Sequence, residues 1–392
     1  MFDPASVKMQ EIIVREGKKD DPKMTVLLEE AVNSYTKTYM AGNQALGRNL
    51  DANAMRNHFY RFPGVDNDKD KTLSAMLRMA VIAQTQERYE KTPVETDEQR
   101  AEKAALEGLV KQLFVELKRD FKPSDLPPYT LVKLGMHLAG TSQPEESIAY
   151  FDEILDPSEP DPVRKKARIN GMSKYRKNAV FGKAVALGRS KDNAKVDTAI
   201  KMMRDELSKE ESSSNPDRKA MEDAQYNLVK FTFARQDWPA VIAAADKYRE
   251  NKTYKKNLPE VLYLQGEAYL KQNELDKALI NFMNITGTYK GLVKWSAPAV
   301  LAQMDTLWKR NTMSQGAGKQ PSDRYVAWKA GSQYVQLLDT PANRKKMTAE
   351  DSALVNEVKD KTAKFGSDPA VSQERADIAA YEAAVRAAKG QK

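Results

Sequence analysis

The stretch of residues 258–291, LPEVLYLQGEAYLKQNELDKALINFMNITGTYKG, decides the fold. Its apolar residues recur at intervals of three and four, which predicts two amphipathic helices separated by the polar turn Lys271–Glu274. The residues expected on the buried sides are Leu262, Gly266 and Tyr269 in the first helix and Leu275, Ala278, Leu279, Phe282 and Ile285 in the second. One helix pair cannot bury its own apolar stripe, so neighbouring pairs of the same kind are required.

Four residues of these stripes match the pattern of a known repeat family. Gly266, Tyr269, Ala278 and Phe282 match the tetratricopeptide (TPR) pattern W-x2-L-G-x2-Y followed by A-x3-F. Leu262 stands where that pattern has its Trp, Gln265 replaces the Leu, and Lys290 replaces the closing Pro. The stretch therefore resembles one TPR unit. The resemblance implies an all-α superhelical array of antiparallel helix pairs, an α-solenoid of about 15 to 17 helices.

Two further helix pairs support the array. The first has the apolar set Leu131, Leu134, Gly135 and Leu138, followed by Ser147 and Phe151. The second spans residues 226–245, and its turn precedes the turn at residues 271–274 by 37 residues. The resemblance covers roughly residues 128–310. We expect an N-terminal helical region at residues 1–122, with divergent repeats as an alternative, TPR-like repeats at 123–311 and a C-terminal helical cap at 312–392.

Composition narrows the class of protein. The chain has 392 residues, of which 41% are hydrophobic and 30% charged, and it contains no cysteine. A chain without thiols suits an oxidising compartment, so we expect a mature bacterial protein of the cell envelope or periplasm, with the cytoplasm as the alternative. The first ten residues lack the basic and apolar segments of a signal peptide.

Candidate catalytic residues are few. Without cysteine and with His58 and His137 as the only histidines, the sequence offers no thiolate nucleophile and no cysteine metal site. The segment Asp66–Asp70 begins like a calcium loop, but Lys71 and Leu77 stand where that loop needs Gly and a carboxylate. We therefore expect no enzyme, no metal and no cofactor. A helical enzyme that uses clustered carboxylates is the alternative.

The resemblance also implies a binding surface. In TPR arrays the first helices of the pairs line a concave groove that holds a protein or peptide. The positions that this places in the groove are Tyr226, Lys230 and Phe233, then Tyr263, Glu267, Leu270 and Lys271, then Met304 and Trp308. Aromatic and charged side chains together suit capture of a peptide. Contact with the next helix is the competing interpretation, above all for the aromatic residues.

A basic stretch is the main anomaly of composition. Residues 162–191 contain ten Lys or Arg and no Asp or Glu, whereas the whole chain has a net charge of +8. Such a cluster predicts an anion-binding patch, for an acidic protein segment, a membrane surface or a polyanion such as nucleic acid, although no nucleic-acid-reading motif is present. The candidate residues are Arg164, Lys165, Lys166, Arg168, Lys174, Arg176, Lys177 and Lys183. An ordinary solvated surface is the alternative interpretation.

Overall fold

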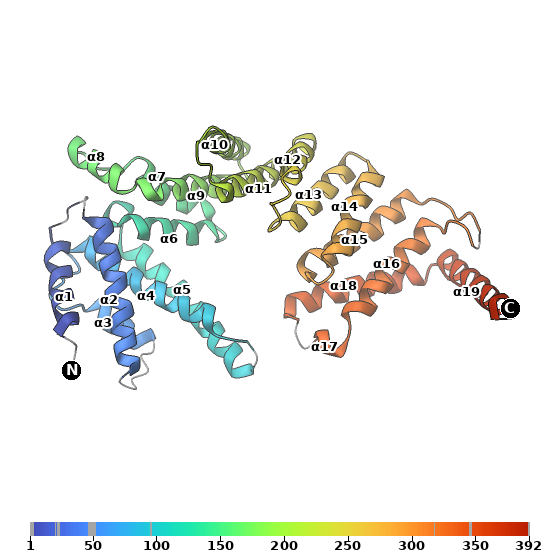
Figure 1. The fold of residues 1–392 in the computed structure, drawn as a ribbon, viewed down its shortest axis with the longest axis horizontal. Coiled ribbons are helices and arrows are strands. Elements are labelled where there is room, and N and C mark those ends of the chain that lie inside the picture. The colour runs from blue at the N-terminus through green and yellow to red at the C-terminus, as the bar shows by residue number, and fades with distance from the viewer. Residues whose placement is uncertain are drawn as a thin grey trace. The chain divides into compact units, whose positions relative to one another are not determined.

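The computed structural model describes residues 4–19, 21, 24–45, 52–94, 96–316, 318–344 and 347–390. Within these residues the chain forms 19 α-helices and three short 3-10 helices, and no strand (Figure 1). Consecutive helices pack against each other as an all-α helical repeat array. The 19 α-helices exceed the roughly 15 to 17 expected from the sequence. The difference arises because the chain also forms short helices, such as α8 (Pro162–Gly171) and α17 (Pro341–Arg344).

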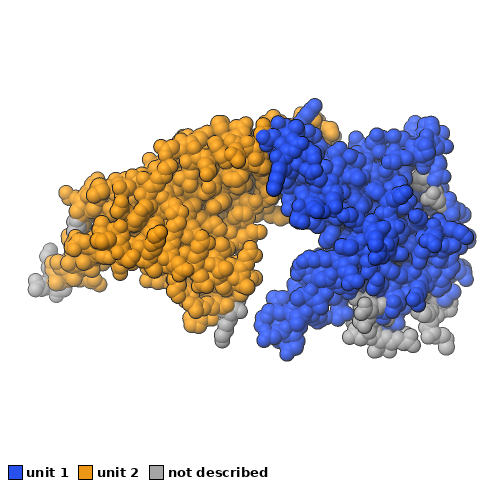
Figure 2. All heavy atoms as spheres, turned by 180° about the vertical axis from the view of Figure 1, so that it is seen from behind, with its two compact units in different colours: residues 1–202 blue, residues 203–392 orange. Residues whose placement is uncertain are grey.

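The chain divides into two compact units, residues 1–202 and 203–392 (Figure 2). This division falls inside the region 123–311 that the sequence assigns to repeats, so repeat-like helix pairs occur in both units. The boundary lies within α10 (Asn193–Glu211). No helix in the described part of the chain is both long and apolar enough to cross a membrane.

Unit 1 contains the helices up to α9 and the start of α10. Their bounds are α1 Pro4–Gly17, α2 Thr25–Ala45, α3 Ala52–Tyr60, α4 Lys71–Lys91, α5 Asp97–Asp120, α6 Pro128–Ala139, α7 Ile148–Leu155 and α9 Arg176–Gly188. One continuous hydrophobic core joins them, with Tyr35, Phe59, Phe114 and Phe151 among its fully buried members. Both histidines stack on aromatic rings: His58 lies on Tyr39 and His137 on Phe114. Burial lowers the pKa of both imidazoles, so they stay uncharged near neutral pH.

A glycine contact fixes the packing of α6, α7 and α9. The ring of Phe151 on α7 lies so close to Gly135 on α6 and Gly182 on α9 that a Cβ atom would be 2.8 Å and 2.2 Å away from it. Only a residue without a side chain fits at either position. In unit 2 Gly266 makes the same contact with Phe282, again 16 residues later in the chain. The small-residue positions expected from the sequence therefore do bring helices into close contact.

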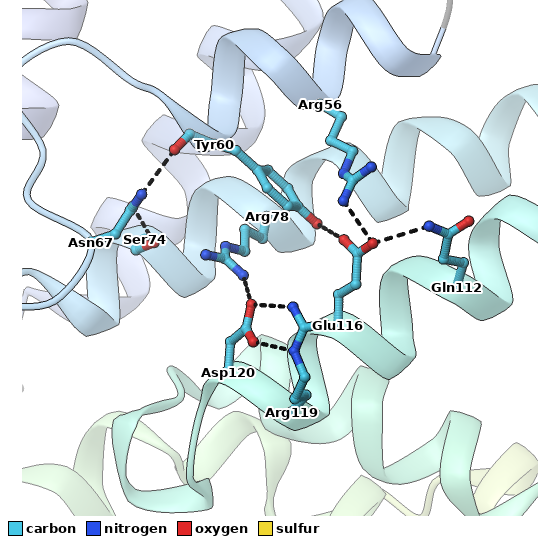
Figure 3. Close-up of polar contacts among 9 residues, drawn as sticks. All are labelled: Arg56, Tyr60, Asn67, Ser74, Arg78, Gln112, Glu116, Arg119 and Asp120. Carbon is cyan, nitrogen blue, oxygen red and sulfur yellow. Dashed lines mark hydrogen bonds and ion pairs between the residues drawn. The ribbon is translucent and has the colours of Figure 1, made fainter.

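A polar cluster joins α3, α4 and α5 (Figure 3). The buried carboxylate of Glu116 accepts hydrogen bonds from Arg56 at 2.7 Å and from the Tyr60 hydroxyl at 3.1 Å. Arg78 donates to Asp120, and its guanidinium lies 4.5 Å from the centre of the Tyr60 ring. Removing one partner of such a group leaves the other charge buried without compensation, which costs about 3–5 kcal/mol.

A second buried carboxylate closes the start of α6. The N-cap position of α6 is Pro127, which offers no capping side chain, and Glu29 on α2 takes its place. The Tyr129 N–H donates to Glu29 at 3.0 Å, across 100 residues of chain. Burial raises the pKa of Glu29 to about 8, while the N–H groups of Tyr129 and Thr130 lower it in part.

Unit 2 continues the array with longer, regular helix pairs. The bounds are α11 Arg218–Ala234, α12 Trp238–Glu250, α13 Leu258–Lys271, α14 Leu275–Thr288, α15 Val293–Arg310, α16 Asp323–Leu338, α18 Ala349–Gly366 and α19 Pro369–Gly390. From the sequence, a helix is predicted at residues 298–310. The structure begins that helix at Val293 and keeps Pro298 inside it, so this expectation is wrong.

Candidate protein-binding surface

The turns of unit 2 set the register of its helices. Gln236, Asn273 and Asn311 all have left-handed backbone angles, with φ of 57°, 61° and 52°. The first two turns also share a hydrogen bond: Asp237 N–H donates to the Thr232 carbonyl, and Glu274 N–H to the Tyr269 carbonyl. The spacing of these turns, 37 and then 38 residues, makes α11, α13 and α15 equivalent helices of successive pairs. They also contact each other in that order.

Three equivalent positions of these helices form what we call the inner ladder. Its first row is Tyr226, Tyr263 and Leu301, its second row Lys230, Glu267 and Asp305, and its third row Phe233, Leu270 and Trp308. Neighbouring members are four or three residues apart in each helix, so each helix presents its three members on one face. All nine are half-buried or exposed.

Polar contacts connect the ladder from helix to helix. The Tyr226 hydroxyl on α11 donates to Glu260 on α13 at 2.5 Å, and Lys230 lies 3.7 Å from the same carboxylate. Burial, followed by this hydrogen bond, raises the pKa of Tyr226. Farther along, Asp305 on α15 pairs with Lys361 on α18 at 2.5 Å. These contacts join α11 to α13 and α15 to α18, so Tyr226, Lys230 and Asp305 already have partners within the array.

Glu267 differs from the other charged members of the ladder. It is half-buried on α13, and within the part of the chain that the structure describes it has neither an ion pair nor a hydrogen bond. Burial raises its pKa, the charge of Lys271 lowers it, and the nearby charge of Asp305 raises it again. A desolvated carboxylate without a partner is costly, so a cation or an N–H donor from another molecule would stabilise it. The half-buried ring of Tyr263 lies one turn earlier on the same helix.

The residues predicted to line the groove do not all lie in the same environment. Tyr226, Lys230, Tyr263, Glu267 and Leu270 lie on the inner ladder, and Lys271 is exposed at the end of α13. Phe233, also a ladder member, packs edge-on against Trp238 at 5.5 Å. Trp308 stacks on Phe365 of α18 at 3.9 Å and is covered by Arg324, so its ring faces are occupied.

Met304 needs a correction. It is fully buried and belongs to the core of unit 2, where its sulfur faces Gly331. It occupies the position that Gly266 has in the preceding pair, because the third turn follows after 38 residues. The α15 residues equivalent to Tyr263 and Glu267 are Leu301 and Asp305, which the sequence analysis missed. Counting from the left-handed turn residues instead of from the apolar pattern would have found them.

The basic stretch is neutralised largely within unit 1. Its cations pair with the acidic residues just before it: Arg164 with Glu159, Lys165 with Asp156, Arg168 with Glu153 and Lys183 with Asp152, at 2.6–3.3 Å. Three other cations of the stretch contact more distant parts of unit 1. Lys174 forms an ion pair with Glu30, while Arg176 and Arg189 donate hydrogen bonds to the carbonyls of Leu155 and Ala139. Lys166 is exposed, and Lys177 is half-buried and has a contact of its own. The excess of positive charge therefore does not form one free surface.

Two members of the stretch, Arg164 and Arg168, line a polar pocket of about 430 Å3. Acidic side chains line it as well, including Asp70, Asp125 and Glu159. Its charges are nearly balanced, which does not favour a polyanion. Among the described residues, no group of three or more His, Cys, Asp or Glu side chains is placed to hold a metal ion.

No known family model matches the chain. A search of curated proteins finds no related sequence either. The function of the site follows from its own geometry. Aromatic, apolar and charged side chains, half-buried or exposed, recur at equivalent positions of the three helices α11, α13 and α15.

Proposed function

We propose that this protein is a non-catalytic scaffold of the TPR type that binds an extended segment of another protein along the inner ladder of unit 2. The observation that carries the proposal is Glu267, a half-buried carboxylate on the middle one of three equivalent helices that makes no hydrogen bond or ion pair with the described residues, although the charge of Lys271 acts on it. A bound segment with a lysine, an arginine or a backbone N–H at this position would pair with it. A chain without cysteine suits the periplasm, which is where we expect the partner.

The arrangement of the buried carboxylates favours a scaffold over an enzyme. Burial raises the pKa of Glu29, Asp223 and Glu267, as in many catalytic acids. Glu29, however, is used to cap α6, and Asp223 and Glu267 lie on different helices, α11 and α13, where both are half-buried. A carboxylate enzyme needs two such groups converging on one substrate.

Site-specific photo-crosslinking tests the proposal. A benzoylphenylalanine residue replaces Leu270 or Leu301 on the ladder, and in a matched control it replaces Ile280, which is 59% exposed on α14. We expect the two ladder positions to yield the same covalent adduct in the native cell, identified by mass spectrometry, and Ile280 to yield none. A Glu267→Lys substitution should then remove the adduct by repulsion, whereas Glu350→Lys, at an exposed position of α18, should leave it unchanged.

Equal adducts from Ile280 and Leu270 would exclude a groove-specific partner. Retention of the adduct in Glu267→Lys, in a variant that melts like the parent, would show that this carboxylate does not select the partner.

A further inference from the structure

One edge of unit 2 is basic over two successive loops. The first loop, residues 251–257, leads from α12 into α13, and the second, residues 289–294, leads from α14 into the first turn of α15. Neither segment contains Asp or Glu, and together they contain Lys252, Lys255, Lys256, Lys290 and Lys294. Because α13 and α15 are equivalent helices that contact each other, the segments that lead into them lie at the same edge of the array.

A hollow of about 900 Å3 connects the two loops. Lys255 of the first loop and Tyr289 of the second both line it, so the loops are neighbours in space. Two carboxylates, Asp246 and Glu250, line it as well, and Asp246 already accepts a hydrogen bond from Gln265 at 2.7 Å.

The five lysines of this edge differ from the cations of the basic stretch in unit 1. All five are exposed, and in the part of the chain that the structure describes their ammonium groups make no ion pair and no hydrogen bond. Burial raises the pKa of Asp223, and the charge of Lys256 lowers it only in part. Lys294 lies 5.5 Å from the centre of the Trp295 ring. The array therefore leaves the positive charge of this edge available to another molecule.

An apolar residue lies between the two lysines of the second loop. Leu292 is 51% exposed and is flanked by Lys290 and Lys294. Hydrogen bonds fix its backbone: the Leu292 N–H donates to the Tyr289 carbonyl at 2.8 Å, and the Ser296 hydroxyl donates to the Lys290 carbonyl at 3.1 Å. The loop thus presents an apolar side chain and two cations from a well-held backbone.

We propose that this edge docks on the surface of an anionic lipid membrane. The lysines lie among the phosphate headgroups, while Leu292 enters the boundary between the headgroups and the acyl chains. Lysine is a compact point charge without the fixed pairing geometry of arginine, which suits mobile headgroups. A nucleic acid or a purely acidic protein segment satisfies the lysines but gives Leu292 no apolar partner.

Co-sedimentation of the full chain with lipid vesicles tests the proposal. The parent protein should bind vesicles that contain phosphatidylglycerol, should not bind vesicles of phosphatidylcholine alone, and should bind less as salt increases. Each lysine near an anionic surface strengthens binding about fivefold, so the triple variant Lys252→Gln, Lys255→Gln, Lys290→Gln should bind about a hundredfold more weakly.

A matched triple variant controls for net charge. It replaces three exposed lysines that lie beside the end of α15, in the first half of α16 and near the end of α18, namely Lys319, Lys329 and Lys364, with Gln. It should bind the vesicles as the parent does. Both triple variants change only exposed side chains, so both should melt like the parent.

A fourth substitution separates a membrane from other polyanions. Leu292→Ser keeps the charge of the edge, and serine is favoured at this N-cap position of α15, so the fold should be retained. It should weaken vesicle binding about three- to tenfold without changing its salt dependence. Binding of polyglutamate or of a DNA duplex should not respond to this substitution.

The proposal is overturned if the two triple variants bind the vesicles equally, because net charge alone would then account for binding. It is also overturned if Leu292→Ser binds the vesicles as the parent does, or if the parent prefers polyglutamate or DNA to the vesicles. Because no ladder residue is altered, these results are independent of the crosslinking at Leu270.

Discussion

Alanine substitutions at two glycines of unit 1 should have opposite effects on stability. A Cβ atom on Gly182 would be 2.2 Å from the Phe151 ring, whereas a Cβ on Gly108, in the middle of α5, would meet nothing within 4 Å. Gly182→Ala should lower the free energy of unfolding by about 1–3 kcal/mol, because the ring cannot move away within a packed core. Gly108→Ala should raise it by about 0.5–1 kcal/mol, because alanine is the better helix former. Urea unfolding of both variants measures the difference, and equal effects would contradict the contact.

The raised pKa of Glu29 predicts that the stability of the protein depends on pH. Its pKa is raised from 4.5 to about 8 in the folded protein, so the folded state holds a proton that the unfolded state releases between these values. Stability should therefore fall as pH rises from about 5 to about 8, by up to about 1.4 kcal/mol per pH unit, and level off above pH 8.

A glutamine at this position isolates the effect. Glu29→Gln still accepts the Tyr129 N–H but cannot ionise, so its stability should not follow this slope. Urea unfolding at pH 5, 6.5 and 8 compares the two proteins, with Glu30→Gln on the neighbouring, 62% exposed side chain as the control. Parallel pH profiles for parent and Glu29→Gln would show that Glu29 stays ionised when folded.

At the scale of the helix pair, the left-handed turn residues carry strain of different sizes. Gln236 has φ of 57°, a region that glutamine adopts at a cost of about 1–2 kcal/mol, whereas asparagine, as at position 273, tolerates it. Gln236→Gly should stabilise the protein by about 1 kcal/mol, and Asn273→Gly by less. Gln272→Gly, at a helix end with φ of −88°, should give no such gain. Thermal unfolding of the three variants ranks them, and a gain at position 272 as large as at 236 would exclude strain as the cause.

The same helix pairs show how far sequence alone could lead. The sequence predicted Gly266 and Phe282 on the buried sides of neighbouring helices, but only the structure shows that these two residues contact each other. Met304 was misplaced because the apolar pattern of α15 has no feature that reveals the extra residue in its repeat. The acidic partners of the basic stretch lie directly before it, in residues 152–161. Counting charges over residues 152–191 instead of 162–191 would have included them. Glu29 could not be assigned to α6, since 100 residues separate Glu29 from Tyr129.

At the scale of the whole chain, the two compact units predict two unfolding transitions. Residues 1–202 and 203–392 each have their own internal packing, and arrays of this kind lose stability unit by unit. In calorimetry, Gly182→Ala should lower the midpoint of one transition by about 2–4 °C for each kcal/mol lost. Gly266→Ala, which crowds Phe282 in unit 2, should lower the other one. A single transition that both substitutions shift equally would show that the chain unfolds as one cooperative body.

The ion pairs of the basic stretch affect how the chain acquires its structure during synthesis. The four pairs with residues 152–159 join residues from five apart, as in Arg164 and Glu159, to 31 apart, as in Lys183 and Asp152. The entropy lost on closing such short loops is small, and it grows only slowly with loop length. Because the acidic residues leave the ribosome first, each cation meets its carboxylate soon after it emerges. We therefore expect these four pairs to form before unit 2 is translated, which would lower the positive charge that the nascent chain presents to the anionic surface of the ribosome.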